Sequence, residues 1–251
     1  MAKASWPQGV SRHILDEVDS TNAHALRLAP TSGGPAWFLA KSQTAGRGRR
    51  ARAWASPVGN FHASLLTFPQ GPPQQIALRS FAIALALRDA FVALTDLPDS
   101  FRLKWPNDVL LTGQKVAGIL LESTGAGGRI THLAIGVGVN LVAAPDPTFL
   151  EPGAVPAVSV LHATGKLFSP EDFLDALAPA FSAWEGVLVE QGFGPLRDAW
   201  LSHAARLGEN ITARTGKEIY QGQFETIDLQ GNLMLRTPHE TLAIPAADVF
   251  F

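Results

Sequence analysis

The sequence contains no cysteine among its 251 residues. Disulfide bonds, zinc sites built from thiolates and cysteine nucleophiles are therefore excluded. The chain also lacks an apolar run of membrane-spanning length, and its N-terminus lacks the apolar core of a signal peptide. We therefore expect a cytoplasmic protein with no membrane partner.

An excess of charge of one sign is also missing from the chain as a whole. The formal net charge is −2, and the isoelectric point is about 6.4. A dedicated nucleic-acid-binding protein usually presents a basic face over a whole domain, and this composition argues against one. Hydrophobic residues make up 46% of the chain, which is enough for a substantial core. The composition indicates one large globular domain, or one domain with a small appendage.

Residues 41–57 depart from this balance, because they carry five basic side chains and no acid. Glycines on either side of Arg47 allow positive φ and a close approach to a ligand, and arginine side chains pair with phosphate or carboxylate oxygens. Apolar segments at 36–40 and 60–67 predict buried strands before and after the basic segment. A phosphate-binding loop held between two core strands is the favoured interpretation. A solvated loop or an RNA-binding segment is the alternative.

A polar quartet, Asp-Ser-Thr-Asn, occupies residues 19–22 between a predicted strand at 12–18 and a short predicted helix at 23–29. Ser20 or Asp19 can cap this helix. Hydroxyl and amide groups at a helix N-terminus can also form a cradle for a small polar head group. The quartet alone does not decide between these two roles.

The rest of the chain predicts an α+β fold with a mixed sheet. We expect a buried helix at 75–95, a strand at 101–108 broken by a proline, hairpins at 109–122 and 122–141, a loop at 143–156, and helices at 169–191 and 194–204. Short β segments at 211–214, 218–224, 233–236 and 241–244 predict a small barrel-like appendage.

Two features of the predicted hairpins carry possible chemistry. Lys115 follows the first turn, where it is either an exposed lysine or an ammonium group directed at an oxyanion. The alternating glycines of Gly-Val-Gly-Val at 136–139 indicate that another backbone or a flat ligand packs closely against the strand. No third glycine opening a helix follows, so this is not a dinucleotide-binding fingerprint.

Five motifs occur in a specific order along the chain. They are Asp-Ser-Thr-Asn at 19–22, Gln-Thr-Ala-Gly-Arg-Gly-Arg-Arg at 43–50, Lys-Trp-Pro-Asn-Asp at 104–108, Lys-Val-Ala-Gly-Ile-Leu at 115–120 and Gly-Val-Gly-Val-Asn at 136–140. Together they resemble the biotin protein ligases. The resemblance extends from about residue 12 to the C-terminus. It implies a catalytic domain of the class II synthetase and biotin ligase type over residues 1–206, and an SH3-like β-barrel over residues 207–251.

The resemblance also implies an activity and its partners. Biotin is activated by ATP to biotinyl-5′-AMP and is then transferred to one lysine of a biotin carboxyl carrier protein, that of acetyl-CoA carboxylase or of a related carboxylase. Mg²⁺ is expected with ATP, with ligands that the motifs do not identify. A homodimer through strand edges of the main sheet is possible. The bifunctional members carry an N-terminal helix-turn-helix domain, whereas only about a dozen residues precede the first predicted strand here. We therefore expect no sequence-specific DNA binding.

Site residues follow from the same resemblance, residue by residue. Biotin binding is assigned to Ser20, Thr21, Asn22, Gln43, Gly46, Arg47, Gly48, Arg49, Lys115 and Gly118. ATP or adenylate binding is assigned to Arg47, Arg49, Arg50, Trp54, Lys104, Asn107 and Asn140, and catalysis to Arg49, Lys115 and Asp108. Two positions depart from the family pattern, because Ala51 and Thr226 stand where many members have glycine.

Two rival functions stay open, one within enzymes and one from another class of protein. Lipoate ligases share the scaffold and the acyl-adenylate chemistry, but they lack a Gly-Arg-Gly-Arg-Arg loop. A non-catalytic RNA-binding protein would use residues 46–52, and its affinity would fall steeply with salt and would not depend on biotin. The basic loop has no large apolar anchor before Trp54, so we expect it to be mobile until an anionic ligand offsets the repulsion among its arginines.

Overall fold

The structure of the chain, a computed structural model, describes residues 5–146, 148, 154–216 and 218–251. Its centre is a seven-stranded mixed sheet with the order β1-β2-β3-β7-β6-β5-β4. The first pair, β1 and β2, is parallel, and the other neighbours are antiparallel. The strands are β1 Ser11–Val18, β2 Ala36–Gln43, β3 Phe61–Thr67, β4 Phe101–Lys104, β5 Asp108–Leu111, β6 Gln114–Ala126 and β7 Arg129–Val139.

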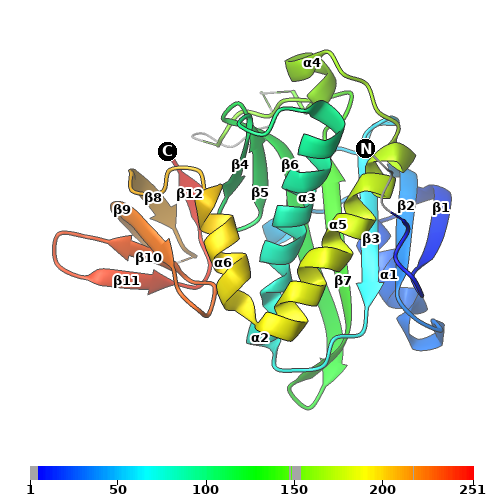
Figure 1. Cartoon of the computed structure of the whole chain (residues 1–251), viewed down its shortest axis with the longest axis horizontal. Helices are drawn as coiled ribbons and strands as arrows, with labels where there is room; N and C mark the ends of the chain where they lie inside the picture. Colours follow the sequence, from blue (N-terminus) through cyan, green and yellow to red (C-terminus); the bar gives the residue numbers. More distant parts are fainter. Residues whose placement is uncertain (1–4, 147, 149–153, 217) are drawn as a thin grey trace.

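Helices cover both faces of this sheet. The long helices α3 (Arg79–Thr95) and α5 (Pro170–Gln191) pack together on one face with α6 (Phe193–Ser202), as Figure 1 shows. On the opposite face lies α1 (Thr21–Leu28). Alternation along β2 divides the two cores, because Trp37 belongs to the larger cluster and Phe38 packs with the α1 cluster.

Most of the predicted elements of this part are confirmed, with shifted boundaries. The helix expected at 75–95 is divided into α2 (Pro73–Ala77) and α3, with helical backbone angles maintained at Leu78 between them. Pro73 starts the first of these helices two residues early, because proline fits the first turn. The short helix α4 (Val160–Thr164) was not expected, and the 3₁₀ turns η1 (Ala29–Thr31) and η2 (Arg49–Ala51) lie in predicted loops.

The C-terminal residues form a separate antiparallel sheet with the order β11-β10-β9-β8-β12. Its strands are β8 Asn210–Arg214, β9 Ile219–Ile227, β10 Leu233–Arg236, β11 Thr241–Ile244 and β12 Asp248–Phe250. The barrel-like appendage expected from the sequence is this five-stranded sheet, and no strand pairing closes it within the described part of the chain. The edge strand β12 was missing from the sequence prediction, because three residues are too short for a periodic pattern.

A continuous apolar core joins the two sheets. Trp200 of α6 lies edge-on to Phe224 of β9, with ring centroids 6.5 Å apart. Trp105 Nε1 donates a hydrogen bond to Gly231 O at 3.1 Å, and Arg197 Nη2 donates one to Thr226 Oγ1 at 2.9 Å. The small sheet therefore rests on the larger part, and the side chain of Thr226 takes part in the junction.

None of the helices in the described ranges is long and apolar enough to cross a membrane.

Candidate active site

A pocket of about 680 Å³ opens at the carboxyl end of β2, between the main sheet and strand β12. It draws residues from all five sequence motifs. The predicted site residues that line it are Ser20, Thr21, Asn22, Gln43, Arg47, Gly48, Arg49, Trp54, Lys104, Asn107, Asp108, Lys115, Gly118 and Asn140.

Two predicted site residues lie next to the pocket rather than in its lining. Gly46 packs so closely that a Cβ atom there would lie 2.8 Å from Trp54 O and 2.9 Å from Gln43 Nε2. Its role in this structure is close approach of the backbone. The guanidinium group of Arg50 pairs with Asp248 of the lining, and its Nη1 is 2.6 Å from Asp248 Oδ2.

The polar quartet forms one end of the pocket, at the N-terminus of α1. Ser20 occupies the N-cap position, but its side chain makes no capping bond, so that part of the sequence interpretation was wrong. Gln43 Oε1 accepts hydrogen bonds from Thr21 N at 2.8 Å and from Thr21 Oγ1 at 3.2 Å. The end of β2 thus supplies a partner for the first turn of the helix. Two hydroxyl groups and an amide therefore meet in a mainly buried, uncharged corner.

Asn22 is engaged within the protein. Its Nδ2 donates to Leu120 O at 3.1 Å and to Glu122 Oε2 at 2.9 Å, and its Oδ1 accepts from Ser64 Oγ at 2.6 Å. Both amide hydrogens are consumed. A Cβ atom at Gly136 would lie 2.5 Å from Asn22 Oδ1, so glycine is needed there to admit this side chain. Asn22 therefore fixes the pocket wall more than it offers donors to a ligand.

The alternating glycines of β7 make room for a flat group, and in this structure that group is the indole of Trp54. A Cβ atom at Gly138 would lie 2.4 Å from Trp54 Cε2, and one at Gly118 would lie 3.1 Å from Cζ3. Lys115 Nζ is 5.6 Å from the centroid of the indole ring. The ring therefore lies across the floor of the pocket, beside the lysine ammonium group.

A largely enclosed carboxylate, with 12% of its side chain exposed, lies between two lysines of the pocket lining. Asp108 Oδ1 is 2.7 Å from Lys115 Nζ, and Asp108 Oδ2 is 3.7 Å from Lys104 Nζ. Burial alone would raise the pKa of Asp108, but the charges of Lys115 and Lys104 outweigh this effect and leave that pKa lowered. Burial has the larger effect on Lys104 and lowers the pKa of its ammonium group. Asp108 is thus ionised and orients both ammonium groups.

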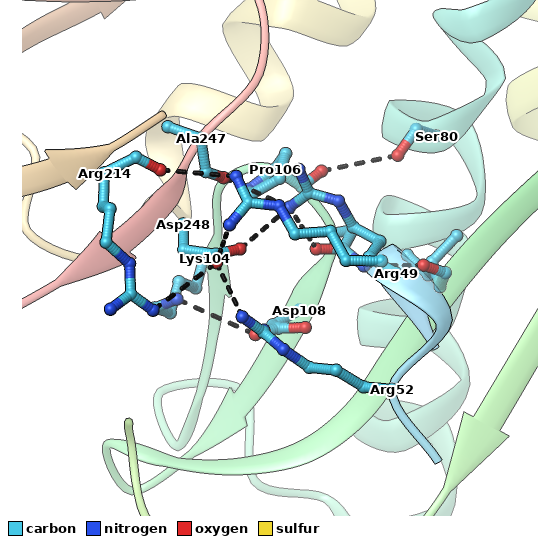
Figure 2. A network of polar contacts seen from close by, with 12 residues as sticks. Arg49, Arg52, Ser80, Lys104, Pro106, Asp108, Arg214, Ala247 and Asp248 are labelled. Carbon is cyan, nitrogen blue, oxygen red and sulfur yellow. Dashed lines mark hydrogen bonds and ion pairs between the residues drawn. The ribbon is translucent and has the colours of Figure 1, made fainter. Parts of the chain in front are cut away.

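The basic loop meets a carboxylate that the sequence interpretation missed. Figure 2 shows Arg49 and Arg52 converging on Asp248 of β12. Arg49 Nη1 also donates to Ala247 O at 3.2 Å and to Asn107 Oδ1 at 3.4 Å, so this guanidinium group bridges the two sheets. The premise that the loop arginines lack an anion in the free protein was therefore wrong.

Other parts of the lining were also missed. Asp248 carried a signal in the sequence, since it is a lone acid within an apolar C-terminal segment. Leu120 and Ile119 belong to a recognised motif but were not assigned to the site. The segment expected as a loop at 143–156 contributes residues at 145, 154 and 155, while 147 and 149–153 lie outside the described residues.

Comparisons with known proteins agree with this geometry. The Biotin/lipoate A/B protein ligase family matches residues 17–140, and the Biotin protein ligase C terminal domain matches residues 207–251. The chain is 54% identical to a biotin–[acetyl-CoA-carboxylase] ligase of Paracoccus denitrificans, over 95% of this chain and 99% of that protein. It is 31% identical to the bifunctional ligase/repressor BirA of Bacillus subtilis strain 168, over 96% of this chain and 74% of that protein.

A solved structure shares the whole architecture. The biotin protein ligase from Aquifex aeolicus in complex with biotin and ATP superposes with a TM-score of 0.79 at 26% identity, covering 95% of this chain and 97% of that chain. Fold, motif order and near-complete coverage by a relative of high identity all lead to one assignment. The chain belongs to the biotin protein ligase family.

Proposed function

We propose that this chain is an ATP-dependent ligase that activates biotin to biotinyl-5′-AMP and transfers the biotinyl group to a lysine of a biotin carboxyl carrier protein. The observation that carries the proposal is a single pocket in which a neutral polar corner adjoins a cluster of lysines and arginines. Such a pocket suits one substrate with a neutral head and an anionic tail, next to a second substrate that is an anion. The named activities of the Paracoccus and Aquifex relatives support this assignment.

Biotin would enter with its ureido ring toward the N-terminus of α1. This ring is neutral and polar, so it needs short hydroxyl and amide partners within an otherwise apolar pocket. Ser20, Thr21 and Gln43 offer these groups, and they adjoin the apolar side chain of Ile119 in the lining. We propose that Asn22 supports this corner from behind, through its bonds to Leu120 and Ser64.

In the first step, a carboxylate oxygen of biotin attacks the α-phosphorus of ATP, and pyrophosphate leaves. Both reacting groups are anions, so their repulsion must be offset where the new bond forms. We assign this role to Lys115, with Arg47 and Arg49 beside it, each contact contributing on the order of 3 kcal/mol in a water-poor site. Asp108 holds the Lys115 ammonium group in the pocket before the substrates arrive. We place the nucleotide against Arg49, Lys104, Asn107 and Asn140, with the adenine against the indole of Trp54. Arg50 would hold the loop through its contact with Asp248.

Magnesium is expected to accompany ATP and would share the negative charge of its phosphates when bound. The described residues contain no cluster of three or more potential side-chain ligands. Mg²⁺ often uses one or two carboxylates and takes its remaining ligands from phosphates and water. Asp108 lines the pocket, but its two oxygens face the ammonium groups of Lys115 and Lys104, so we propose that the ATP phosphates and water supply most of the magnesium ligands.

In the second step, the amine of the carrier lysine attacks the carbonyl carbon of the mixed anhydride, and AMP leaves. The amine must lose a proton, since a lysine in water has a pKa of about 10.4. Among the residues assigned to catalysis, Asp108 is the carboxylate that could accept this proton. The lowered pKa of Asp108 makes it a weak base, so we propose that its main contribution is to orient Lys115.

Several features of the whole molecule stay proposals. The match of two separate family domains supports the division into residues 1–206 and 207–251. Dependence on ATP fits a cytoplasmic location.

The edge strand β1 is largely exposed, which would allow two copies of the chain to pair through their main sheets. The absence of specific DNA binding also remains a prediction.

The transfer reaction tests the proposal against its rivals. With a biotin carboxyl carrier domain, biotin and Mg-ATP, we expect one biotinyl group on one carrier lysine, detected by mass spectrometry. Lipoate in place of biotin should give no product. Binding of labelled RNA that falls steeply with salt and ignores biotin, together with an unmodified carrier, would favour the RNA-binding alternative.

A further inference from the structure

Asp248 is the first residue of β12. Its neighbours Ala247 and Val249 are buried, and the Cα atom of Asp248 pairs with that of Arg214 across to β8. Because side chains alternate along a strand, burial of both neighbours directs the Asp248 side chain away from the core and toward the pocket. The side chain lines the pocket and is 11% exposed.

Three arginines of the basic loop converge on this carboxylate. Asp248 Oδ2 is 2.6 Å from Arg50 Nη1 and 2.8 Å from Arg52 Nη2, and Asp248 Oδ1 is 3.8 Å from Arg49 Nη1. A fourth guanidinium group approaches from β8, where Arg214 Nη2 is 3.9 Å from Oδ2. One acid of the small sheet therefore lies among several guanidinium groups, and Figure 2 shows Asp248 between Arg49, Arg52 and Arg214.

The charge of this group matters more than its packing. Burial alone would raise the pKa of Asp248, but the hydrogen bond from Arg52 and the charges of Arg52, Arg50 and Arg49 lower it, so the group is ionised. The loop arginines lie within four residues of one another, and their guanidinium groups would spread apart without a central anion. Arg49 is the most deeply placed of the three, and burial lowers the pKa of its guanidinium group.

We propose that Asp248 is a positioning residue for the nucleotide, which gathers Arg49, Arg50 and Arg52 and fixes Arg49 at the pocket wall before ATP binds. The inference rests on the proposed function, since it concerns the ATP that this ligase consumes. Through Asp248, the small sheet determines the conformation of the basic loop. Asp248 itself does not contact the reacting atoms. The affinity for ATP, more than that for biotin, depends on it, because the polar corner at α1 belongs to the main sheet.

Two roles of Asp248 predict opposite changes in ATP affinity when its charge is removed. If Asp248 acted only as a negative charge in the pocket, it would repel the phosphates, and its removal would improve ATP binding. If it positions the arginines, its removal weakens ATP binding. Asp248→Asn keeps the shape and removes the charge, Asp248→Glu keeps the charge, and Glu225→Gln removes a carboxylate from an exposed pair with Arg236 in the same small sheet.

The experiment measures biotin-dependent ATP–pyrophosphate exchange for the full chain, with Mg²⁺, varying ATP and biotin separately. For Asp248→Asn we expect a KM for ATP raised at least about fivefold and a KM for biotin changed by less than about twofold. Asp248→Glu should restore the KM for ATP to within about threefold of the wild type, and Glu225→Gln should match the wild type. Without ligands, trypsin should cut after the loop arginines at least about threefold faster in Asp248→Asn than in the control.

The outcomes separate this inference from the proposed function. A wild-type chain that gives no exchange overturns the proposed function and, with it, the inference. If the wild type is active, an unchanged or lowered KM for ATP in Asp248→Asn overturns the inference alone. A fall in kcat and melting temperature with both KM values unchanged would show a merely structural role for Asp248 and would also overturn it.

Discussion

At the scale of the residue, opposite charges hold the catalytic groups in place before any substrate is present. Lys115 lies against Asp108, and the loop arginines lie against Asp248. Each carboxylate orders cationic side chains that would otherwise become ordered only when a phosphate binds. The entropic cost of ordering these long side chains therefore falls on folding and not on ligand binding.

Removal of the Lys115 ammonium group tests its catalytic role. For Lys115→Ala we expect the yield of biotinyl-AMP to fall at least about 100-fold, because the charge acts where negative charge accumulates in the transition state. The fold should survive, since Lys104 still faces Asp108. Adenylate is quantified with labelled ATP, beside a melting temperature. Lys41→Ala, which removes an exposed ion pair with Asp16, is the matched control. A near-normal yield in Lys115→Ala would remove this residue from the catalytic set.

The contact between Gly138 and the indole of Trp54 gives a second test. A methyl group at residue 138 would lie 2.4 Å from the ring, so Gly138→Ala must move the indole off β7. We expect a shifted tryptophan emission and a biotin-dependent exchange rate reduced at least about tenfold, since the pocket floor changes shape. Gly186→Ala is the control, because nothing lies within 4 Å of a Cβ atom there. That change lies inside α5 and should stabilise the protein by about 1 kcal/mol. Equal activity of the two variants would contradict the role given to the β7 glycines.

The role of a residue could be predicted from the sequence where its partners lie within the same short motif. The alternating glycines at 136 and 138 indicated close packing of a flat group, and the structure shows which group lies there. Asp248 could not be assigned in this way, because its partners lie about 200 positions earlier in the chain. Neither sequence spacing nor periodicity reports such a pairing. The hydrogen bonds from Asn22 Nδ2 to Leu120 O and Glu122 Oε2 likewise depend on tertiary contacts, so the sequence did not predict them.

At the scale of the element, the basic loop is an ordered segment that only a few hydrogen bonds and exposed ion pairs hold in place. Its ends are fixed by backbone hydrogen bonds such as Trp54 N to Gly46 O at 3.0 Å and Gly48 N to Arg52 O at 2.8 Å. Arg50 and Ala51 adopt positive φ values of 54° and 56°. A non-glycine residue in that region costs about 1 kcal/mol, so the glycine found at position 51 in many family members would relax this turn. Arg50 and Arg52 are 38% and 42% exposed, and exposed ion pairs contribute little.

Ligands should therefore still close the loop further. In the wild type, we expect biotin plus Mg-ATP to slow tryptic cleavage after Arg47, Arg49, Arg50 and Arg52 at least about tenfold, because phosphate contacts add to those of Asp248. Cleavage after Arg129, an exposed residue at the start of β7, provides an internal control that ligands should not change. If the loop is cut equally fast with and without ligands, it is either fixed already or not part of the site.

Elements with a strong local pattern were predicted well. The start of α5 is an example, since Ser169 Oγ accepts from Asp172 N and Pro170 occupies the first turn, as the sequence indicated. The strand β12 is three residues long and exists only because it pairs with β8. A segment that short is fixed by its partner, which no local propensity reveals.

At the scale of the whole molecule, the two sheets share one apolar core. Phe224 and Leu233 of the small sheet belong to the same cluster of buried side chains as Phe81 and Trp200 of the main part. A small sheet with so much of its apolar surface on a neighbour is not expected to unfold by itself. The mixed α+β class was predictable from the strand and helix patterns, whereas the open form of the small sheet was not.

Shared burial predicts a single unfolding transition. All six tryptophans precede residue 207, so their fluorescence reports on the main part, while far-ultraviolet circular dichroism reports on both sheets. We expect the two signals to coincide during urea unfolding. A circular dichroism change at lower urea than the fluorescence change would mean that the small sheet unfolds first, and would contradict a common core.

The most direct measurement of the whole account is incorporation of labelled pyrophosphate into ATP by the purified chain. We expect exchange that requires both biotin and Mg²⁺, saturates with each substrate and is lost in Lys115→Ala, because the neutral corner and the cationic cluster serve one adenylation step. Exchange that is absent, or that proceeds equally without biotin, would contradict the assignment of this pocket to biotin activation.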